Sequence, residues 1–281
     1  MASEIDLHIH TTASDGTMSP EELVGRAKRA GLGVLAVTDH DTMAGVDSAV
    51  SAGAALGVEV IPGIEISTDY RGEDVHVLGY GLDAAHPALR EVLNWVQEDR
   101  RRRNERIARR MQADGIHISL AELEAEHPGA TIGRPHFARV LVEQGRAQSV
   151  SDAFHRFLDP GKPYYLSRTY LPIARGIEII RRCGGAAVLA HPLQYGYSPA
   201  ELRRLVAEVA AFGVGGMEIY YTGYDAGQRG ALSALAAEFG LFATGGSDFH
   251  GANKPQIVLG ALDVPEQCLT DLKAWLGRDG V

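Results

Sequence analysis

The 281-residue sequence predicts an α/β protein whose strands close into a barrel, and three observations support this. Short apolar runs rich in β-branched residues alternate with helical patterns, which is typical of repeated βα units and a parallel sheet. Hydrophobic residues make up 45% of the chain and charged residues 22%, as in ordinary soluble domains. Chemically capable side chains stand at the ends of nearly all the predicted strands, where barrel active sites collect.

Seven strands are expected, and helices follow most of them. The strands are IDLHI (5–9), VLAVT (34–38), VEVIPGIEIS (58–67), DVHVLGY (74–80), AAVLAH (186–191), GMEIYY (216–221) and LFATGG (241–246); the helices cover 20–31, 44–57, 198–213 and 226–240. Pro20 suits a first helical position, and several of these helices end at a glycine, as helices commonly do. An open sheet is the alternative, but the residues at the strand ends favour the barrel.

The alternation breaks between about residues 86 and 185. Residues 86–115 read as one long helix, and helical fragments follow at 119–127, 134–145 and 150–158. Residues 99–170 hold 13 Lys and Arg against 9 Asp and Glu, although the whole chain is acidic, with 27 against 36. We therefore predict a barrel formed by residues 1–98 and 171–281, and a mainly helical insertion, residues 99–170, that caps the active site.

Composition narrows the classes of partner. The chain shows no signal-peptide pattern and no apolar stretch long enough to span a bilayer, so we expect a cytoplasmic protein without a membrane partner. Its two cysteines, Cys183 and Cys268, fit a reducing compartment. A net charge of −9 argues against binding duplex DNA. The sequence carries no signal of oligomeric state.

Histidines and carboxylates gather at the strand ends. In a strand, alternate residues point to the same side, so His8 and His10 face together. The full set is His8, His10, Asp15, His40, Glu65, His76, His191, Asp248 and His250. Four to six such ligands satisfy one transition-metal ion, so nine indicate two or three divalent ions, with Glu65 suited to bridge two of them. Closely spaced dications favour an anionic partner such as phosphate.

This pattern resembles a known family. The segments DLHIHTTASDG, AVTDHD, PGIEIS, VHVLGY, LAHP and GGSDFH resemble, in order, the PHP (polymerase and histidinol phosphatase) family. The resemblance implies a distorted (β/α)7 barrel with a trinuclear metal centre and phosphoesterase activity. It implies that His8, His10, Glu65 and Asp248 hold one ion, that Glu65, His76 and His191 hold a second, and that Asp15, His40 and His250 hold a third. Mn²⁺ is the expected metal, with Fe²⁺ or Zn²⁺ as alternatives.

The helical insertion indicates which members of the family the sequence resembles most. Its segments RRRRNERIARRM, TIGRPHFARVLVEQG and GKPYY resemble the bacterial members that act on 3′,5′-nucleoside bisphosphates, some of which also trim short oligoribonucleotides from the 5′ end. By that resemblance, the substrate's second phosphate and sugar are bound by Arg103, Asn104, Arg134 and His136. Arginine suits phosphate because its planar fork donates to two oxygens at once. The alternative for the arginine-rich helix is a solvated face.

The resulting hypothesis is hydrolysis of the 3′-phosphate of 3′,5′-nucleoside bisphosphates, such as 3′,5′-bisphosphoadenosine, by a hydroxide that bridges two metal ions. Short 5′-phosphorylated oligoribonucleotides are a further expected substrate. The alternatives are a histidinol-phosphatase-like phosphomonoesterase, an amidohydrolase-type deaminase or amidase, a metal or nucleotide sensor, and a polymerase proofreading domain. A lysine-bridged amidohydrolase is disfavoured because none of the four lysines lies at a predicted strand end. Asp39, Asp41 and Glu218 are candidates either to orient the ligands or to serve structure.

Overall fold

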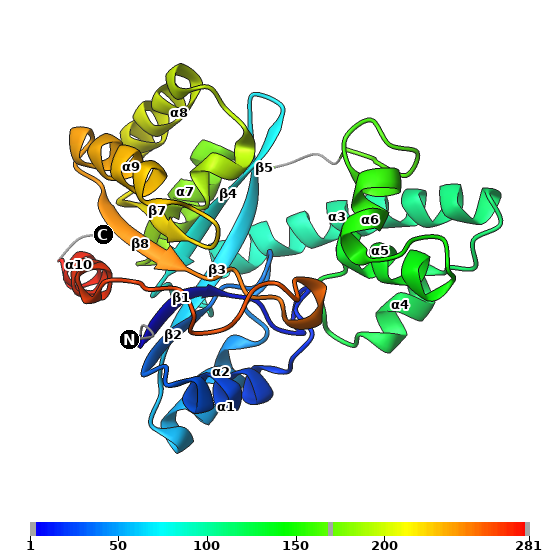
Figure 1. Ribbon diagram of the computed structural model, residues 1–281, viewed down its shortest axis with the longest axis horizontal. Coiled ribbons are helices and arrows are strands. Elements are labelled where there is room, and N and C mark those ends of the chain that lie inside the picture. Colours follow the sequence, from blue (N-terminus) through cyan, green and yellow to red (C-terminus); the bar gives the residue numbers. More distant parts are fainter. Residues whose placement is uncertain (1–3, 168–170, 279–281) are drawn as a thin grey trace.

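The computed structural model describes residues 4–167 and 171–278 and confirms the α/β barrel (Figure 1). Within these ranges the strands are β1 (Ile5–Ile9), β2 (Val34–Val37), β3 (Glu59–Tyr70), β4 (Glu73–Tyr80), β5 (Leu171–Pro172), β6 (Ala186–Leu189), β7 (Gly216–Tyr221) and β8 (Phe242–Gly246). Their order in the sheet is β1-β2-β3-β4-β6-β7-β8, and the short β5 pairs with β3.

Backbone hydrogen bonds between the segment around β1 and the residues that follow β8 close the barrel. The amide of Asp248 donates to the carbonyl of His8 over 2.8 Å, and the amide of His10 donates to Phe249 over 3.0 Å. This approach requires a glycine at position 246, because a Cβ there would lie 2.3 Å from both the backbone nitrogen and the Cβ of His8. The first strand and the last segment of the barrel therefore meet at the ends where the predicted ligands lie.

The expectation of a parallel sheet is wrong around β4. This strand runs antiparallel to both β3 and β6, whereas the other pairs that form the barrel wall are parallel. A tight turn at Arg71 and Gly72, with φ of 58° and 90°, connects β3 directly to β4. Turns with positive φ at both central residues match the twist of a hairpin, so no helical crossover is needed here.

Helices cover the outside of the barrel. They are α1 (Pro20–Ala30), α2 (Val46–Leu56), α7 (Ile173–Arg182), α8 (Pro199–Phe212), α9 (Ala226–Glu238) and α10 (Glu266–Leu276). Helix α1 starts as predicted: Pro20 is its first residue, and the preceding Ser19 forms a capping box with Glu22. Helices α7 and α10 were not expected from the sequence. In α7, the buried Ile173, Ile177 and Ile180 form one apolar face that packs on the sheet.

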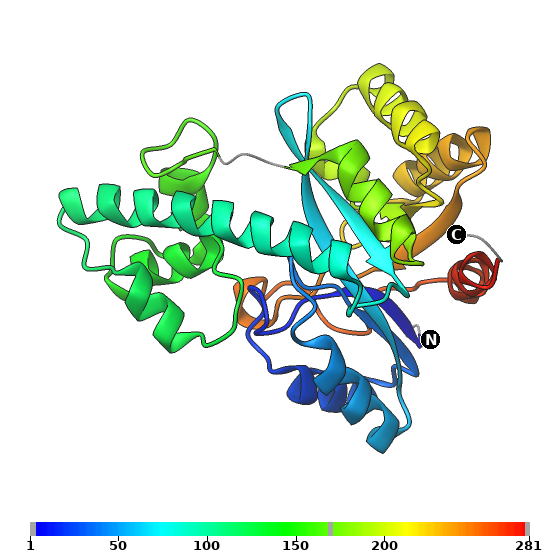
Figure 2. The same ribbon diagram turned by 180° about the vertical axis from the view of Figure 1, so that it is seen from behind.

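The insertion is built on one long helix, α3 (Pro87–Ala113), which extends away from the barrel (Figure 2). Its first half buries Leu89 and Val96 in the barrel core, and its second half buries Ile107 and Met111 in a separate core. That second core is completed by α4 (Leu120–Glu126), α5 (Arg134–Glu143), α6 (Val150–Ala153) and a π-helical turn at Phe154–Leu158. The division at residues 98/99 and 170/171 stays a prediction.

None of the helices in the described part of the chain combines the length and the apolar character needed to cross a lipid bilayer.

Candidate metal centre

All nine side chains predicted as ligands converge at the mouth of the barrel. They fall into four overlapping groups whose ligand atoms lie within 4.8 Å of one another: His10, Asp15, His40 and His250; His8, Glu65 and His191; His8, His10 and Asp248; His40, Glu65 and His76. This convergence is what a site for several ions requires. The ligand assignment itself stays a prediction; His76 and His191 fall in different groups, each of which includes Glu65.

Glu65, on β3, lies at the centre of the cluster and is almost completely buried. Nitrogens of five imidazoles surround its carboxylate: His76 at 2.8 Å and His191 at 2.9 Å from one oxygen, and His40 at 3.1 Å, His10 at 3.2 Å and His8 at 3.3 Å from the other. Contact with imidazoles through both oxygens is the arrangement expected of a bridging carboxylate.

His8 and His10 face each other across a gap that suits a cation. Their Nε2 atoms are 3.2 Å apart, and they lie 3.6 Å and 3.3 Å from the same oxygen of Asp248. Glu218, on β7, contacts His8 Nδ1 at 3.0 Å and accepts the backbone amide of His191 at 2.7 Å. A carboxylate on Nδ1 favours a proton there and leaves Nε2 with its lone pair toward the gap. Glu218 therefore orients a predicted ligand.

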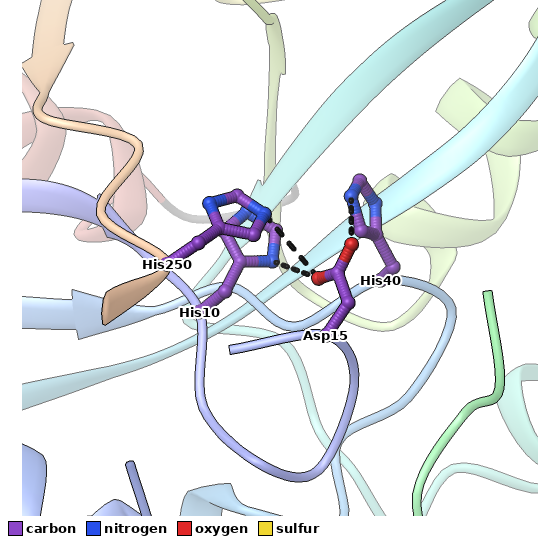
Figure 3. Close-up of side chains that lie close together, drawn as sticks. All are labelled: His10, Asp15, His40 and His250. Atoms are coloured by element: carbon purple, nitrogen blue, oxygen red, sulfur yellow. Dashed lines mark ion pairs between the residues drawn. The ribbon is translucent and has the colours of Figure 1, made fainter. Parts of the chain in front are cut away.

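Asp15 lies among three imidazoles, two of which also contact Glu65 (Figure 3). Its carboxylate lies 3.3 Å from His250 Nε2, 3.7 Å from His10 Nδ1 and 3.8 Å from His40 Nε2. The loop that carries Asp15 is held by the buried carboxylate of Asp39, which accepts the amide of Thr11 at 2.7 Å, its hydroxyl at 2.6 Å and the hydroxyl of Ser14 at 2.5 Å. Asp39 thus fixes the position of Asp15.

Two residues that were not predicted hold Asp248 in place. The Tyr221 hydroxyl donates to Asp248 Oδ2 over 2.6 Å, and Lys254 Nζ lies 2.5 Å from the same oxygen. Oδ1 is the oxygen that faces the imidazoles of His8, His10 and His250. Sequence reasoning missed Lys254 because its role depends on the fold of the loop after β8. Its proximity to Asp248 in the sequence was the available signal.

Buried carboxylates dominate the electrostatics. Burial alone would lower the pKa of the histidines, but Asp248 and Glu65 raise the pKa of His10 to about 9, and Glu65 and Asp74 raise that of His76 to about 10. For His40, burial prevails, helped by the neighbouring His10 and His76, and lowers the pKa to about 3. Burial opposes ionisation of Glu65, but the surrounding imidazoles hold its pKa well below the usual range. The buried carboxylates therefore give the centre a negative potential that attracts protons or metal cations.

A cavity of about 730 Å³ opens over this centre, within the range of small-molecule sites. Asp15, His40, His76 and His250 line its metal-centre side, and four cations, Arg100, Arg103, Arg134 and Lys254, also border it. The insertion adds apolar side chains, Pro135, Val142, Val150 and Phe154.

Of the four predicted substrate residues, Arg103 and Arg134 line the cavity and Asn104 and His136 do not. Asn104 is buried, accepts the Arg103 Nε–H over 3.1 Å and donates to the carbonyl of Ile132 over 2.8 Å, so it supports Arg103. His136 is buried and accepts the amide of Gly133 at 3.1 Å, closing the first turn of α5. Burial lowers the pKa of His136 to about 3, so it is neutral.

Arg100 lines the cavity but was not among the predicted site residues. Its guanidinium pairs with the buried carboxylate of Asp41, which also accepts the amide of Ser67 at 2.9 Å. The pair joins α3 to the barrel. Arg100 belongs to the same run of four arginines as Arg103, and the sequence could not show which of the four faces inward.

A barrel with imidazoles and carboxylates converging at its mouth, beside a cation-lined cavity, defines a class of barrel hydrolases. The PHP domain model matches residues 6–166, and the chain belongs to the PHP domain family.

The relatives point to one branch of this family. The chain is 40% identical over 247 residues to the 5′-3′ exoribonuclease Rnm of Escherichia coli, covering 87% of this chain and 84% of that one. It is 34% identical over 250 residues to a 3′,5′-nucleoside bisphosphate phosphatase of Chromobacterium violaceum, covering 88% and 87%. A solved structure from the same organism, described as an amidohydrolase with bound sulfate and no metal, superposes with a TM-score of 0.89 at 32% identity, covering 97% of each chain.

Proposed function

We propose that this protein is a metal-dependent phosphomonoesterase that removes the 3′-phosphate of 3′,5′-nucleoside bisphosphates such as 3′,5′-bisphosphoadenosine. The observation that carries the proposal is the direct opening of the histidine and carboxylate cluster into a cavity bordered by Arg100, Arg103, Arg134 and Lys254. Planar guanidinium groups match phosphate oxygens, and a bisphosphate offers one phosphate to the centre and one to the arginines.

The donor set fits two or three divalent ions, and we propose Mn²⁺, with Fe²⁺ or Zn²⁺ as alternatives. His8, His10, Glu65 and Asp248 would hold one ion, Glu65, His76 and His191 a second, and Asp15, His40 and His250 a third. When bound, such ions polarise the phosphate and activate water for in-line attack on phosphorus. The convergence of imidazole nitrogens around Glu65 and Asp248 supports this assignment.

Several neighbouring residues orient the predicted metal ligands. Glu218 sets the tautomer of His8, Tyr221 and Lys254 turn one oxygen of Asp248 toward the histidines, and Asp39 fixes the loop of Asp15. Arg134 lines the cavity, 3.7 Å from Asp74, and we propose that it binds the phosphate that is not cleaved. The insertion shields the site from one side.

The test is phosphate release from 3′,5′-bisphosphoadenosine by metal-free protein resupplied with Mn²⁺, beside AMP and histidinol phosphate. Rapid release from the bisphosphate and little from AMP is expected, because only the bisphosphate engages both the centre and the arginines. His10→Ala should lose this activity while retaining its circular dichroism spectrum. If no phosphate ester is cleaved with any metal, the proposal fails, and amide substrates become the alternative.

A second substrate class is favoured by the exoribonuclease relatives at 39–40% identity. We infer that short 5′-phosphorylated oligoribonucleotides are also trimmed from the 5′ end. Incubation with a labelled 5′-phosphorylated trinucleotide should release mononucleotides one at a time. An intact trinucleotide after complete hydrolysis of the bisphosphate would restrict the enzyme to mononucleotides.

We propose that the protein is cytoplasmic and that its partner is a small nucleotide. Both cysteines, Cys183 and Cys268, are buried and free of disulfides, which supports a reducing cytoplasmic location. The acidic chain with its confined cationic cavity supports a small nucleotide rather than duplex DNA or a membrane as its partner.

A further inference from the structure

The cavity has an apolar wall that phosphate chemistry does not use. Pro135 and Val142 come from α5, seven residues apart and so on one helical face, and Val150 and Phe154 are one helical turn apart. All four are only partly buried, and Val142, Val150 and Phe154 pack with their inner sides against the core of the insertion. The core therefore holds these side chains in place while part of each remains open to the cavity.

A chain of contacts connects this wall to the candidate metal centre. His76 lies 2.8 Å from Glu65 and, through its other ring nitrogen, 3.3 Å from Asp74. Asp74 lies 3.7 Å from Arg134, whose guanidinium carbon is 5.9 Å from the centre of the Phe154 ring. The aromatic ring thus lies one side chain beyond the cation placed to bind phosphate, just as a nucleotide carries its base one sugar away from its phosphate.

Phe154 is also the first residue of the π-helical turn Phe154–Leu158, directly after α6. Such turns are rare and often occur at functional sites. The aromatic rings of Phe154 and Tyr165 both lie near the Arg134 guanidinium, at 5.9 Å and 5.7 Å, so this cation lies between two aromatic rings and Asp74.

We propose that Pro135, Val142, Val150 and Phe154 form a nucleobase-binding surface on which the substrate's base packs against the Phe154 ring. This inference rests on the proposed function, since it presumes a nucleotide substrate. Stacking on an aromatic ring tolerates every base, because each base has a π-face. The surface therefore selects nucleotides over other phosphate esters without selecting among bases.

The experiment compares 3′,5′-bisphosphoadenosine with 1-deoxyribose 3,5-bisphosphate, which has the same sugar and phosphates but no base. Wild-type protein, Phe154→Ala, Phe154→Tyr and the control Phe212→Ala are loaded with Mn²⁺. Phe212 is a half-exposed phenylalanine on α8, in the barrel part of the chain. We expect wild-type kcat/KM to favour the nucleotide by about 5- to 150-fold, the range that loss of one stacking contact produces.

Phe154→Ala should remove this preference, because it lowers kcat/KM for the nucleotide more than for the base-free compound, and Phe154→Tyr and Phe212→Ala should retain it. Equal hydrolysis of both compounds by the wild type, or an equal loss on both in Phe154→Ala, would overturn the inference. Hydrolysis of neither defeats the proposed function. In that case, calorimetry compares the binding of 5′-AMP with that of ribose 5-phosphate. Tighter binding of AMP that is lost in Phe154→Ala would support the nucleobase-binding surface. Equal binding of the two compounds, or binding of neither, would overturn it.

Discussion

At the scale of single residues, the candidate centre depends on side chains that orient its ligands. Glu218 is completely buried and contacts His8 through one oxygen and the backbone of His191 through the other. Replacing it changes no predicted ligand, so its effect reports on orientation alone.

Glu218→Gln is expected to weaken Mn²⁺ binding and lower activity by about 10- to 100-fold, the usual cost of losing a carboxylate behind a ligating histidine. The amide keeps the volume but no longer favours a proton on His8 Nδ1. Metal affinity is measured by calorimetry and activity by phosphate release. The matched control is Glu201→Gln, at the exposed start of α8. Equal metal affinity in the two variants would show that Glu218 serves packing only.

At the scale of elements, one glycine decides whether the barrel closes. A Cβ on Gly246 would lie 2.3 Å from the backbone of His8, which cannot move without shifting β1. Gly246→Ala should therefore destabilise the fold by about 1–3 kcal/mol, the cost of overpacking, and weaken metal binding. Gly230→Ala is the control, because a Cβ there meets nothing within 4 Å on α9. It should instead stabilise the helix by about 0.5–1 kcal/mol. Urea unfolding measures both, and a shift of the same sign would contradict this account.

The attachment of α3 is a second property of an element. Arg100 and Asp41 form a buried pair between this helix and the barrel. Arg100→Gln should lower the free energy of unfolding by about 3–5 kcal/mol, the usual cost of breaking a buried ion pair by removing one of its members. The control is Arg102→Gln, which removes an exposed arginine two residues further along α3. It should change stability by about 0.5 kcal/mol or less. Similar urea midpoints for the two variants would show that the pair does not hold the helix.

At the scale of the whole molecule, metal binding should be coupled to proton release. In the metal-free centre the pKa of His10 is about 9 and that of His76 is about 10, so both imidazoles are protonated at pH 7.5. A metal ion needs their lone pairs, so binding should expel protons and tighten as pH rises. Titration of Mn²⁺ in two buffers of different ionisation enthalpy measures this release. No difference between the buffers would mean that the imidazoles are already neutral.

The same pKa values predict how the metal-free fold responds to pH. Each imidazole gains a proton affinity above its unfolded value, so its stabilising contribution is present below about pH 6.5. That contribution is lost as pH rises through about 9 to 10. The melting temperature of metal-free protein should therefore fall over this window, whereas Mn²⁺-loaded protein should not show the same loss. A flat profile for the metal-free protein would contradict the assigned pKa values.

The sequence predicted those features of the fold and of the site that depend on local residue pattern. His8 and His10 could be placed at the end of a strand, Glu65 within a strand and Asp248 just beyond one, because apolar runs mark the strands and residue types mark the chemistry. The antiparallel β4 was missed because a two-residue turn at Arg71 and Gly72 replaces the expected helix. Partners such as Lys254 and Tyr221 were missed because tertiary closure brings them to Asp248. Asn104 and His136 lie behind the cavity wall, because the direction of a side chain is set by packing.

The closure of the barrel between its first and last segments has a consequence for folding during translation. The predicted ligands extend from His8 to His250, and His10 draws on both Asp15 and Asp248. A chain emerging from the ribosome therefore lacks the complete set until residue 250 has been made. Glu65 and His76 share one hairpin and meet early, but the partners across the seam arrive last. Translation thus delays assembly of the full centre until its first and last segments can meet.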